Sequence, residues 1–221
     1  QAAVGAQFGI SNTELITVQA GGLSSAGPPG TGVTNKLTWD DAEAIERLST
    51  VKAAIPRMMP MGKLEYNDIL GFGMAVSIPD GERRKLTHEI MDIEATEGRM
   101  LKDGDTNKIV LGWNFYASDD LFGEAIVPGK TVLIQDEKFI VAGILKKKGS
   151  FIFDNMVLMN EDVVADLFDY GEDADLIGVI VKDKDLMERA KEDIEKLMRK
   201  RRDVDKGKED FEVSTPDAML D

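Results

Sequence analysis

The sequence predicts an α+β protein in which a β-rich segment interrupts a unit of mixed strands and helices. Both flanks of the 221-residue chain carry strand–helix–strand patterns, whereas the middle is richer in short apolar strands and turns. Hydrophobic residues make up 43% of the chain, which is enough to build a core. These observations predict a discontinuous subdomain of residues 1–80 and 150–221, with an inserted subdomain of residues 81–149.

The N-terminal flank is expected to form a strand, a long loop, a helix and further strands. Residues 15–19 are rich in β-branched side chains and predict the first strand. Residues 38–41 have the pattern of a capping box, and apolar residues follow at helical spacing as far as Leu48. Pro56 places the next strand at a sheet edge or a bulge. The further strands are predicted over residues 51–59, 62–68 and 72–78.

The middle of the chain is predicted to be built mainly from short strands. Two helices are expected here, over residues 82–93 and over residues 114–122, the second closed by Gly123. A short apolar strand is expected over residues 109–112. The polar turn of residues 135–138 predicts a hairpin. Its two strands are residues 131–134 and 139–144.

The C-terminal flank returns to the pattern of the first. The clearest helix in the chain is predicted over residues 184–202, because apolar residues fall on one face and acidic residues precede basic ones at i,i+4 spacing. The other elements expected here are a strand at 156–159, a helix at 161–168, and strands at 175–181 and 211–214.

A glycine-rich stretch, "GPPGTGVT" at residues 27–34, differs by one residue from a phosphate-binding loop. Val33 stands where the lysine that reaches the β and γ phosphates would be required. Three residues separate the stretch from the helix cap at Thr38, although a phosphate loop opens directly into its helix. We therefore interpret the stretch as a loop and expect no nucleotide or other cofactor.

Metal and catalytic chemistry are limited by the residues available. The chain has no cysteine and a single histidine, His88, with no nucleophile nearby in sequence. Residues 103–107 begin like a calcium loop, but Lys108 replaces the required glycine and Asn114 the required glutamate. The methionines at 58, 59 and 61 have no histidine or cysteine to complete a soft-metal site. We expect no metal and no catalytic residues.

The charge of the chain limits its partners. Lys and Arg number 27 and Asp and Glu 41, so the net charge is −14, which argues against nucleic acid and anionic lipid. No stretch reaches the roughly twenty apolar residues of a membrane span, and no signal peptide is evident. Because the chain begins at Gln1 without an initiator methionine, we expect it to be part of a longer protein.

The order of several stretches resembles a known family. The sequence carries "ELITVQAGG", "LTWDDAEAIERL", "EGRMLKDGDTNKIVLGWNFYASDDLFG", "VPGKTVLIQDEKFIVAGIL" and "NMVLMNEDVVADLF" in this order. Most of the resemblance lies in Gly98-Arg99, Leu111-Gly112, Leu121-Phe122, Pro128-Gly129-Lys130 and Val141–Leu145. Together they resemble the extracytoplasmic core domain of MacB/FtsX-type ABC transporter permeases, over about residues 15–214.

This resemblance implies a position between the first and second membrane helices of a permease, on the extracytoplasmic face of the cell membrane. It implies a porter-like α+β subdomain, residues 1–80 and 150–221, with a smaller sabre-like insertion at 81–149. The implied partners are a second permease copy, a cytoplasmic ABC ATPase and an extracytoplasmic client or cargo. No catalytic residue is implied, because ATP hydrolysis belongs to the ATPase.

The glycine-rich loop is then a candidate partner contact, since exposed loops often carry binding. Its candidate residues are Leu23, Pro28, Pro29 and Val33. Two other functions remain open from the residues alone. One is a free-standing soluble module that binds a ligand or a protein, and the other is a degenerate nucleotide-binding enzyme.

Overall fold

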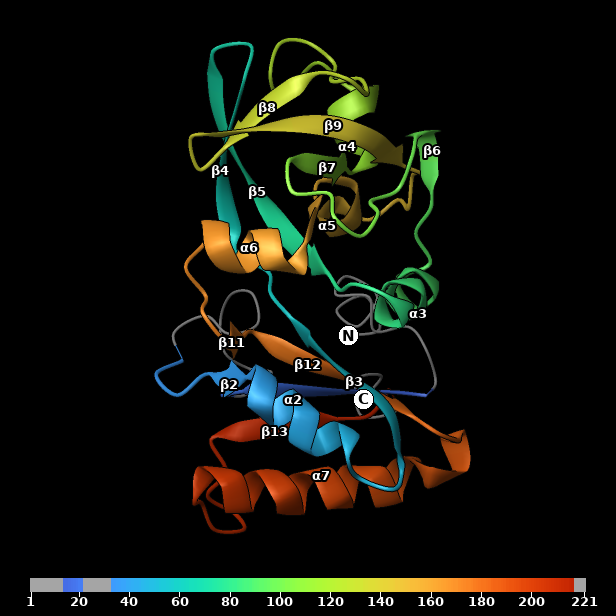
Figure 1. The fold of residues 1–221 in the computed structure, drawn as a ribbon, viewed down its shortest axis with the longest axis vertical. Coiled ribbons are helices and arrows are strands. Elements are labelled where there is room, and N and C mark those ends of the chain that lie inside the picture. Colours follow the sequence, from blue (N-terminus) through green and yellow to red (C-terminus); the bar gives the residue numbers. More distant parts are fainter. Residues whose placement is uncertain (1–13, 22–32, 217–221) are drawn as a thin grey trace. The chain divides into compact units, whose positions relative to one another are not determined.

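The computed structural model describes residues 14–21 and 33–216, which fold into two compact units (Figure 1). Unit 1 comprises residues 1–57 and 170–221, and unit 2 comprises residues 58–169. The chain therefore passes from one unit to the other twice, between Arg57 and Met58 and between Asp169 and Tyr170.

The described residues of unit 1 form a four-stranded antiparallel sheet with two α-helices, α2 (Trp39–Glu46) and α7 (Met187–Arg202). The strand order is β13-β1-β12-β3, with β1 (Leu15–Ala20), β3 (Val51–Arg57), β12 (Leu176–Val181) and β13 (Phe211–Ser214). A 3-10 turn, η1 (Lys184–Leu186), precedes α7. Two short strands, β2 (Leu37–Thr38) and β11 (Asp173–Ala174), pair separately.

The core of unit 1 lies between this sheet and both helices. Ile16 and Val179 from the central strands pack in one cluster with Ile45 of α2 and with Ile194 and Met198 of α7. All five side chains are fully buried. The apolar spacing seen in the sequence therefore marks the helix faces that cover the sheet.

Local signals in unit 1 form as predicted. The Thr38 hydroxyl accepts the Asp41 N–H at 3.2 Å, and the Asp41 carboxylate accepts the Thr38 N–H at 3.0 Å, so the capping box at the start of α2 is complete. Pro56 lies on β3, an edge strand of the sheet, where its missing N–H breaks no ladder on the open side.

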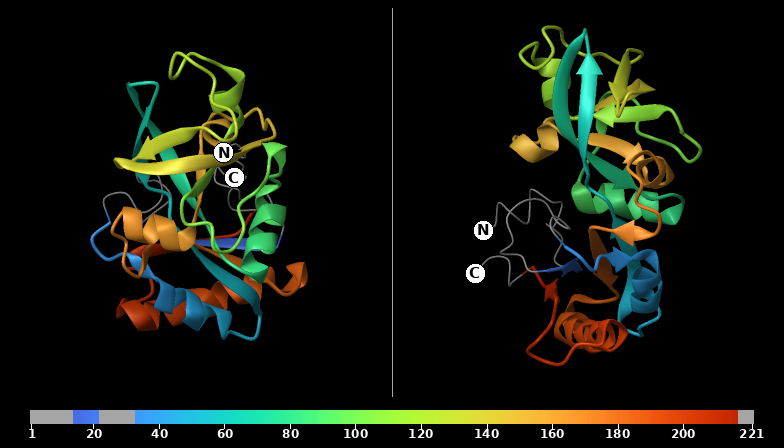
Figure 2. Two further views of the ribbon diagram at one scale, coloured as in Figure 1. Left: turned by 45° about the horizontal axis from the view of Figure 1, so that its top comes forward. Right: turned by 90° about the vertical axis from the view of Figure 1, so that its left-hand side faces the viewer.

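Unit 2 is built on seven strands, six of which close into a ring (Figure 2). The ring order is β9-β7-β10-β5-β4-β8, and β8 pairs back onto β9. The strands are β4 (Met61–Tyr66), β5 (Ile69–Ile78), β7 (Lys108–Leu111), β8 (Thr131–Ile134), β9 (Glu137–Leu145) and β10 (Val157–Asn160), with β6 (Ala95–Gly98) added beside β9. The helices are α3 (Glu82–Met91), α4 (Trp113–Ala117), α5 (Phe151–Asp154) and α6 (Glu161–Leu167).

Two-residue turns set the register of both hairpins in unit 2. Asn67 and Asp68 join β4 to β5, and Gln135 and Asp136 join β8 to β9, all with positive φ between 50° and 68°. Two consecutive positive φ values are typical of the hairpin turn that matches strand twist. The predicted turn of residues 135–138 is thus shorter than expected, because β9 already begins at Glu137.

The α+β fold class is confirmed, but some elements differ from the sequence prediction. The helix expected over residues 114–122 ends at Ala117. Beyond it, Phe122 is buried beside Gly71 and meets Tyr66 edge to face. Burying this aromatic ring outweighs the local helical pattern. Strands β2, β6 and β11 and helix α5 were not predicted, because none shows a periodic apolar pattern long enough to be recognised.

The two units do not follow the subdomain boundaries expected from the sequence. The expected limits at residues 80/81 and 149/150 fall within unit 2. Strands β4, β5 and β10 carry mixed apolar patterns like those of the flanks, yet they hydrogen-bond into one ring with β7, β8 and β9. The division into porter-like and sabre-like subdomains stays a prediction.

Candidate interaction site

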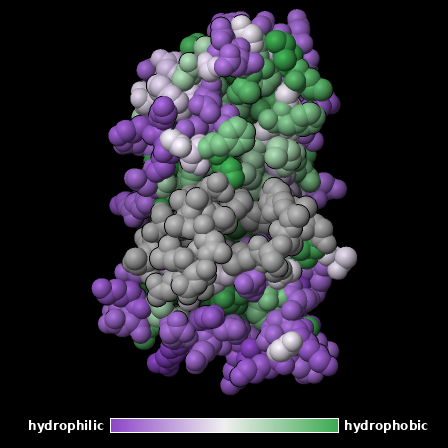
Figure 3. All heavy atoms as spheres, turned by 180° about the vertical axis from the view of Figure 1, so that it is seen from behind, coloured by the Kyte–Doolittle hydropathy of each residue, from purple (hydrophilic) through white to green (hydrophobic). Residues whose placement is uncertain are grey.

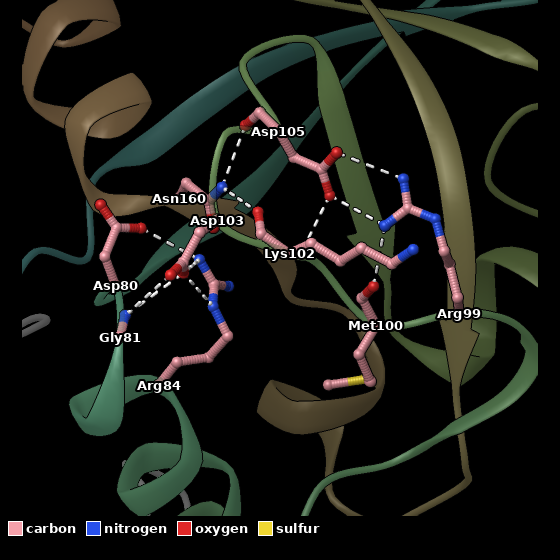
Figure 4. Close-up of polar contacts among 9 residues, drawn as sticks. All are labelled: Asp80, Gly81, Arg84, Arg99, Met100, Lys102, Asp103, Asp105 and Asn160. Carbon is pink, nitrogen blue, oxygen red and sulfur yellow. Dashed lines mark hydrogen bonds and ion pairs between the residues drawn. The ribbon is translucent and has the colours of Figure 1, made fainter.

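The carboxylates of Asp103 and Asp105 form ion pairs with arginine side chains (Figure 4). Arg84 on α3 donates from Nε to Asp103 at 3.0 Å and from Nη2 to Asp80 at 3.0 Å. The N–H of Gly81 also donates to Asp103, at 3.2 Å to the nearer oxygen. These hydrogen bonds lower the pKa of Asp103. The bond from the Gly81 N–H has the largest effect, followed by the bond from Arg84.

Asp105 holds a second arginine in the same loop (Figure 4). Arg99 donates to it through both terminal nitrogens, at 2.8 and 3.2 Å, and this pairing lowers the pKa of Asp105. The amide of Asn160, at the end of β10, donates to the Lys102 and Asp105 carbonyls at 2.9 and 3.0 Å. The loop is thereby tied to α3 and β10.

This network accounts for the stretch that begins like a calcium loop. Its carboxylates are engaged by guanidinium groups rather than arranged around a cation. Within residues 14–21 and 33–216, no group of three or more histidine or acidic side chains could hold a metal ion. These contacts hold the loop against α3 and β10 of unit 2.

A hollow of about 520 Å³ lies beside α6 in unit 2. Its lining mixes the apolar Phe139, Val163 and Leu167 with charges of both signs, such as Lys138 and Asp162. Sites for small organic ligands are typically lined mostly by apolar groups with a few polar ones. We assign no ligand to this hollow.

Several glycines in the stretches that carry the family resemblance allow backbone segments of unit 2 to approach one another closely. Gly98 and Gly143 face each other across β6 and β9. A Cβ at Gly143 would overlap the Arg99 carbonyl oxygen, and a Cβ at Gly112 would lie 2.5 Å from the Asp154 carbonyl oxygen. These positions are required for packing, which makes them markers of the fold rather than of a ligand site.

One face of the β4–β5 hairpin exposes large apolar side chains to solvent. Met61, Leu70 and Phe72 are 57%, 58% and 70% exposed. In the hairpin register, Phe72 lies opposite Lys63 and Leu70 opposite Glu65, so alternation places all of these residues on one side of the ribbon. We call Met61, Leu70 and Phe72 the β4–β5 apolar face. Figure 3 shows hydrophobic side chains gathered on the exposed surface of unit 2.

The opposite side of the same ribbon faces the interior of the ring. Leu64 is buried there, and Gly71 and Gly73 leave room for the Phe122 ring and the Leu64 side chain. Ile134 of β8 is fully buried on this side. Because the interior is filled by these residues, the apolar face is not part of the core of the ring.

The predicted contact loop and this face belong to different units of the chain. Leu23, Pro28 and Pro29 lie outside the described residues, so their role stays a prediction. Val33 is half-buried and packs against the core of unit 1, whereas the β4–β5 apolar face belongs to unit 2. The sequence analysis missed this face because both sides of the predicted strands carry apolar residues.

No helix within the described parts of the chain is long and apolar enough to span a membrane.

Comparison with known proteins gives the family. Residues 1–197 match the family described as MacB-like periplasmic core domain. The chain belongs to this family. The resemblance inferred from the residue patterns is therefore confirmed. MacB-like core domains are periplasmic or extracellular parts of ABC transporter permeases.

A curated relative supports the MacB-like assignment. The uncharacterized ABC transporter permease MJ1507 of Methanocaldococcus jannaschii is 31% identical over 191 residues. The match covers 86% of this chain and 46% of the relative, so the chain spans about half the length of that permease.

Solved structures show the same fold. The periplasmic region of MacB from Actinobacillus actinomycetemcomitans has a TM-score of 0.72 at 18% identity, covering 100% of this chain and 96% of that one. The extracellular domain of the noncanonic ABC-type transporter YknZ from Gram-positive bacteria has a TM-score of 0.66 at 15% identity, covering 91% of this chain and 100% of that one.

Proposed function

We propose that this MacB-like domain transmits ATP-driven motion from cytoplasmic ATPase domains to an extracytoplasmic client or cargo. The observation that carries the proposal is the family match over residues 1–197, supported by the whole-chain likeness to the MacB periplasmic region. In this role the domain catalyses no reaction. ATP hydrolysis takes place on a cytoplasmic ATPase domain or subunit, and a second permease copy completes the transporter.

The two-unit architecture supports this role. Each unit has its own buried core, and the chain crosses between them at residues 57/58 and 169/170. The Arg57 carbonyl accepts the Asp175 N–H within unit 1 at 2.9 Å. The next residue, Met58, donates its N–H to the Ser77 hydroxyl within unit 2 at 2.9 Å. The backbone on each side of the first crossing is therefore hydrogen-bonded within its own unit.

Distance measurements on the full-length permease dimer test the transmission. Because this domain contains no cysteine, a single spin label can be attached at Lys138→Cys in unit 2 or at Lys196→Cys on helix α7 in unit 1. We expect ATP binding to change the distance distribution between the labels of the two copies at both positions. Four-residue Gly-Ser insertions at 57/58 and 169/170 should abolish the change at Lys138→Cys while preserving it at Lys196→Cys. If ATP leaves the distances between the labels unchanged in the permease without insertions, the proposal is wrong.

We also propose that the loop of Leu23, Pro28, Pro29 and Val33 contacts a partner subunit. The support is its composition of apolar and conformationally restricted residues in a connecting segment. Replacing residues 23–33 with a Gly-Ser segment of equal length should weaken dimer formation by the full-length permease at least threefold. If the variant forms dimers at the same protein concentration as the unaltered permease, the loop is not part of the dimer interface.

A further inference from the structure

The β4–β5 apolar face lies on the part of the hairpin that extends beyond the pairing of β5 with β10. Phe72, the largest side chain on it, is 70% exposed, and Leu70 and Met61 are 58% and 57% exposed. Strand β4 pairs with β8 at Leu64 and Glu65, whereas β5 pairs with β10 only over residues 75–78, beyond Leu70 and Phe72. The exposed side chains of this face are therefore open to contacts with a partner.

Clustered exposed apolar side chains on one face are typical of a protein-binding surface. Single exposed hydrophobic residues are ordinary, but a contiguous group with a polar rim marks an interaction site. Here Lys63 and Glu65 lie across the hairpin from Phe72 and Leu70, so charged side chains lie beside the apolar ones on the same face.

The charges around the face favour a basic partner. Lys63 is neutralised by Asp136, with 2.8 Å between Nζ and Oδ1. Glu65 and the exposed Asp68 add negative charge, and Lys138 on β9 offsets only one of them. The whole chain carries a net charge of −14. Two copies pressed together through this face would bring like charges into contact, which disfavours self-association.

We propose that the β4–β5 apolar face binds a protein partner through an apolar segment flanked by lysine or arginine. The inference rests on the proposed function, since it names the class of partner that the extracytoplasmic domain would engage. In this complex, Phe72 and Leu70 are the anchors, and Glu65 and Asp68 pair with the basic residues of the partner. Aromatic and large apolar side chains surrounded by a polar rim commonly dominate such interfaces.

Two matched synthetic peptides test the proposal on the 221-residue chain. Both form amphipathic helices with the same leucine face, and their polar faces carry either lysine or glutamate. We expect the lysine peptide to shift the NMR amide signals of residues 61–74 and to bind at least tenfold more tightly than the glutamate peptide. The double variant Leu70→Ser/Phe72→Ser should lose this binding, with an unchanged circular dichroism spectrum.

Phe151→Ser is the matched control, because Phe151 is 80% exposed but belongs to α5 and not to the hairpin. This variant should bind the lysine peptide like the original chain. Equal affinity for both peptides, or binding that survives in the double variant, would overturn the proposal.

Two other occupants of the β4–β5 apolar face, a second copy of the chain and lipid, are tested by separate measurements. Dimerisation of the chain in sedimentation experiments, lost in the double variant, would assign the face to a second copy and overturn the proposal. Binding to phosphatidylcholine vesicles that depends on Phe72 would assign it to lipid with the same consequence. None of these results changes the ATP-dependent distances expected for the full-length permease. A wrong assignment of the partner can therefore be distinguished from a wrong proposal of ATP-driven motion.

Discussion

Replacing Gly143 with alanine is expected to destabilise the domain by about 3 kcal/mol or more. Gly143 lies in β9 opposite Gly98 of β6, where the following residue, Arg99, runs against the β9 backbone. A Cβ at this position would overlap the Arg99 carbonyl oxygen and would lie 2.9 Å from the Arg99 nitrogen. The obstacle is backbone, so rotation of a side chain cannot relieve it.

The surrounding contacts prevent the Arg99 segment from moving away. Its N–H donates to the Ala142 carbonyl at 3.0 Å, and its guanidinium is paired with Asp105. Relieving the overlap would break these bonds and expose buried groups. We therefore expect Gly143→Ala to fold with a much lower urea midpoint or to fail to accumulate as folded protein.

Gly178→Ala is the matched control. Gly178 also lies in a strand, β12, but an added Cβ there meets its nearest atom, Cδ1 of Leu15, at an ordinary 3.7 Å. The control should change the free energy of unfolding by no more than about 1 kcal/mol. Equal urea midpoints for the two variants would contradict the close-approach role of Gly143.

Replacing Glu161 with glutamine is expected to stabilise the domain at pH 8. Glu161 is the first residue of α6 and is half-buried. Burial first, and then the nearby charges of Asp80 and Asp162, raise the pKa of Glu161 to about 7, and Arg83 and the Asp80 N–H oppose the rise only in part. The same surroundings, burial together with Asp162 and Asp103, also raise the pKa of Asp80.

The direction of the pH effect follows from the raised pKa. Between the ordinary value of 4.5 and about 7, the unfolded chain loses the Glu161 proton while the folded domain keeps it. Stability therefore falls as the pH rises through this window, and the full penalty is present above about pH 7. Each unit of pKa corresponds to roughly 1.4 kcal/mol, so the penalty is at most about 3 kcal/mol and smaller where solvent reaches the carboxylate.

Urea unfolding at pH 5.5 and pH 8 measures this effect. The original chain should be less stable at pH 8 than at pH 5.5, and Glu161→Gln should reduce the difference by about 1 kcal/mol or more. Glu192→Gln, on the exposed side of α7, should leave the difference unchanged. A pH dependence that persists in full in Glu161→Gln would exclude this carboxylate as its source.

Much of the local structure could be predicted from the sequence because neighbouring residues decide it. The capping box at Thr38 forms as predicted, and Pro56 lies on an edge strand. Helix α7 begins three residues later than expected, after a 3-10 turn, but ends at Arg202 as predicted. Backbone geometry and apolar periodicity act within a few residues, which is why such elements are legible from one sequence.

The family could also be recognised from the sequence. The stretches around Gly98, Gly112 and Gly143 carry the resemblance, and the family match confirms it. Their physical role was not visible, because each glycine is required by a backbone segment distant in the chain. Gly112, for instance, lies against the carbonyl of Asp154, 42 residues further along the sequence.

Only the tertiary structure decided how these elements combine. Strands β4, β5 and β10 join the ring of unit 2 through pairings between residues far apart in sequence, which no local pattern specifies. Asp103 finds its arginine 19 residues away, so an apparent cation loop became an ion-pair network. Apolar residues occupy both sides of the β4–β5 hairpin, and the sequence alone could not assign the outer side. The closed ring fills its interior with one side, and this leaves Leu70 and Phe72 exposed on the other.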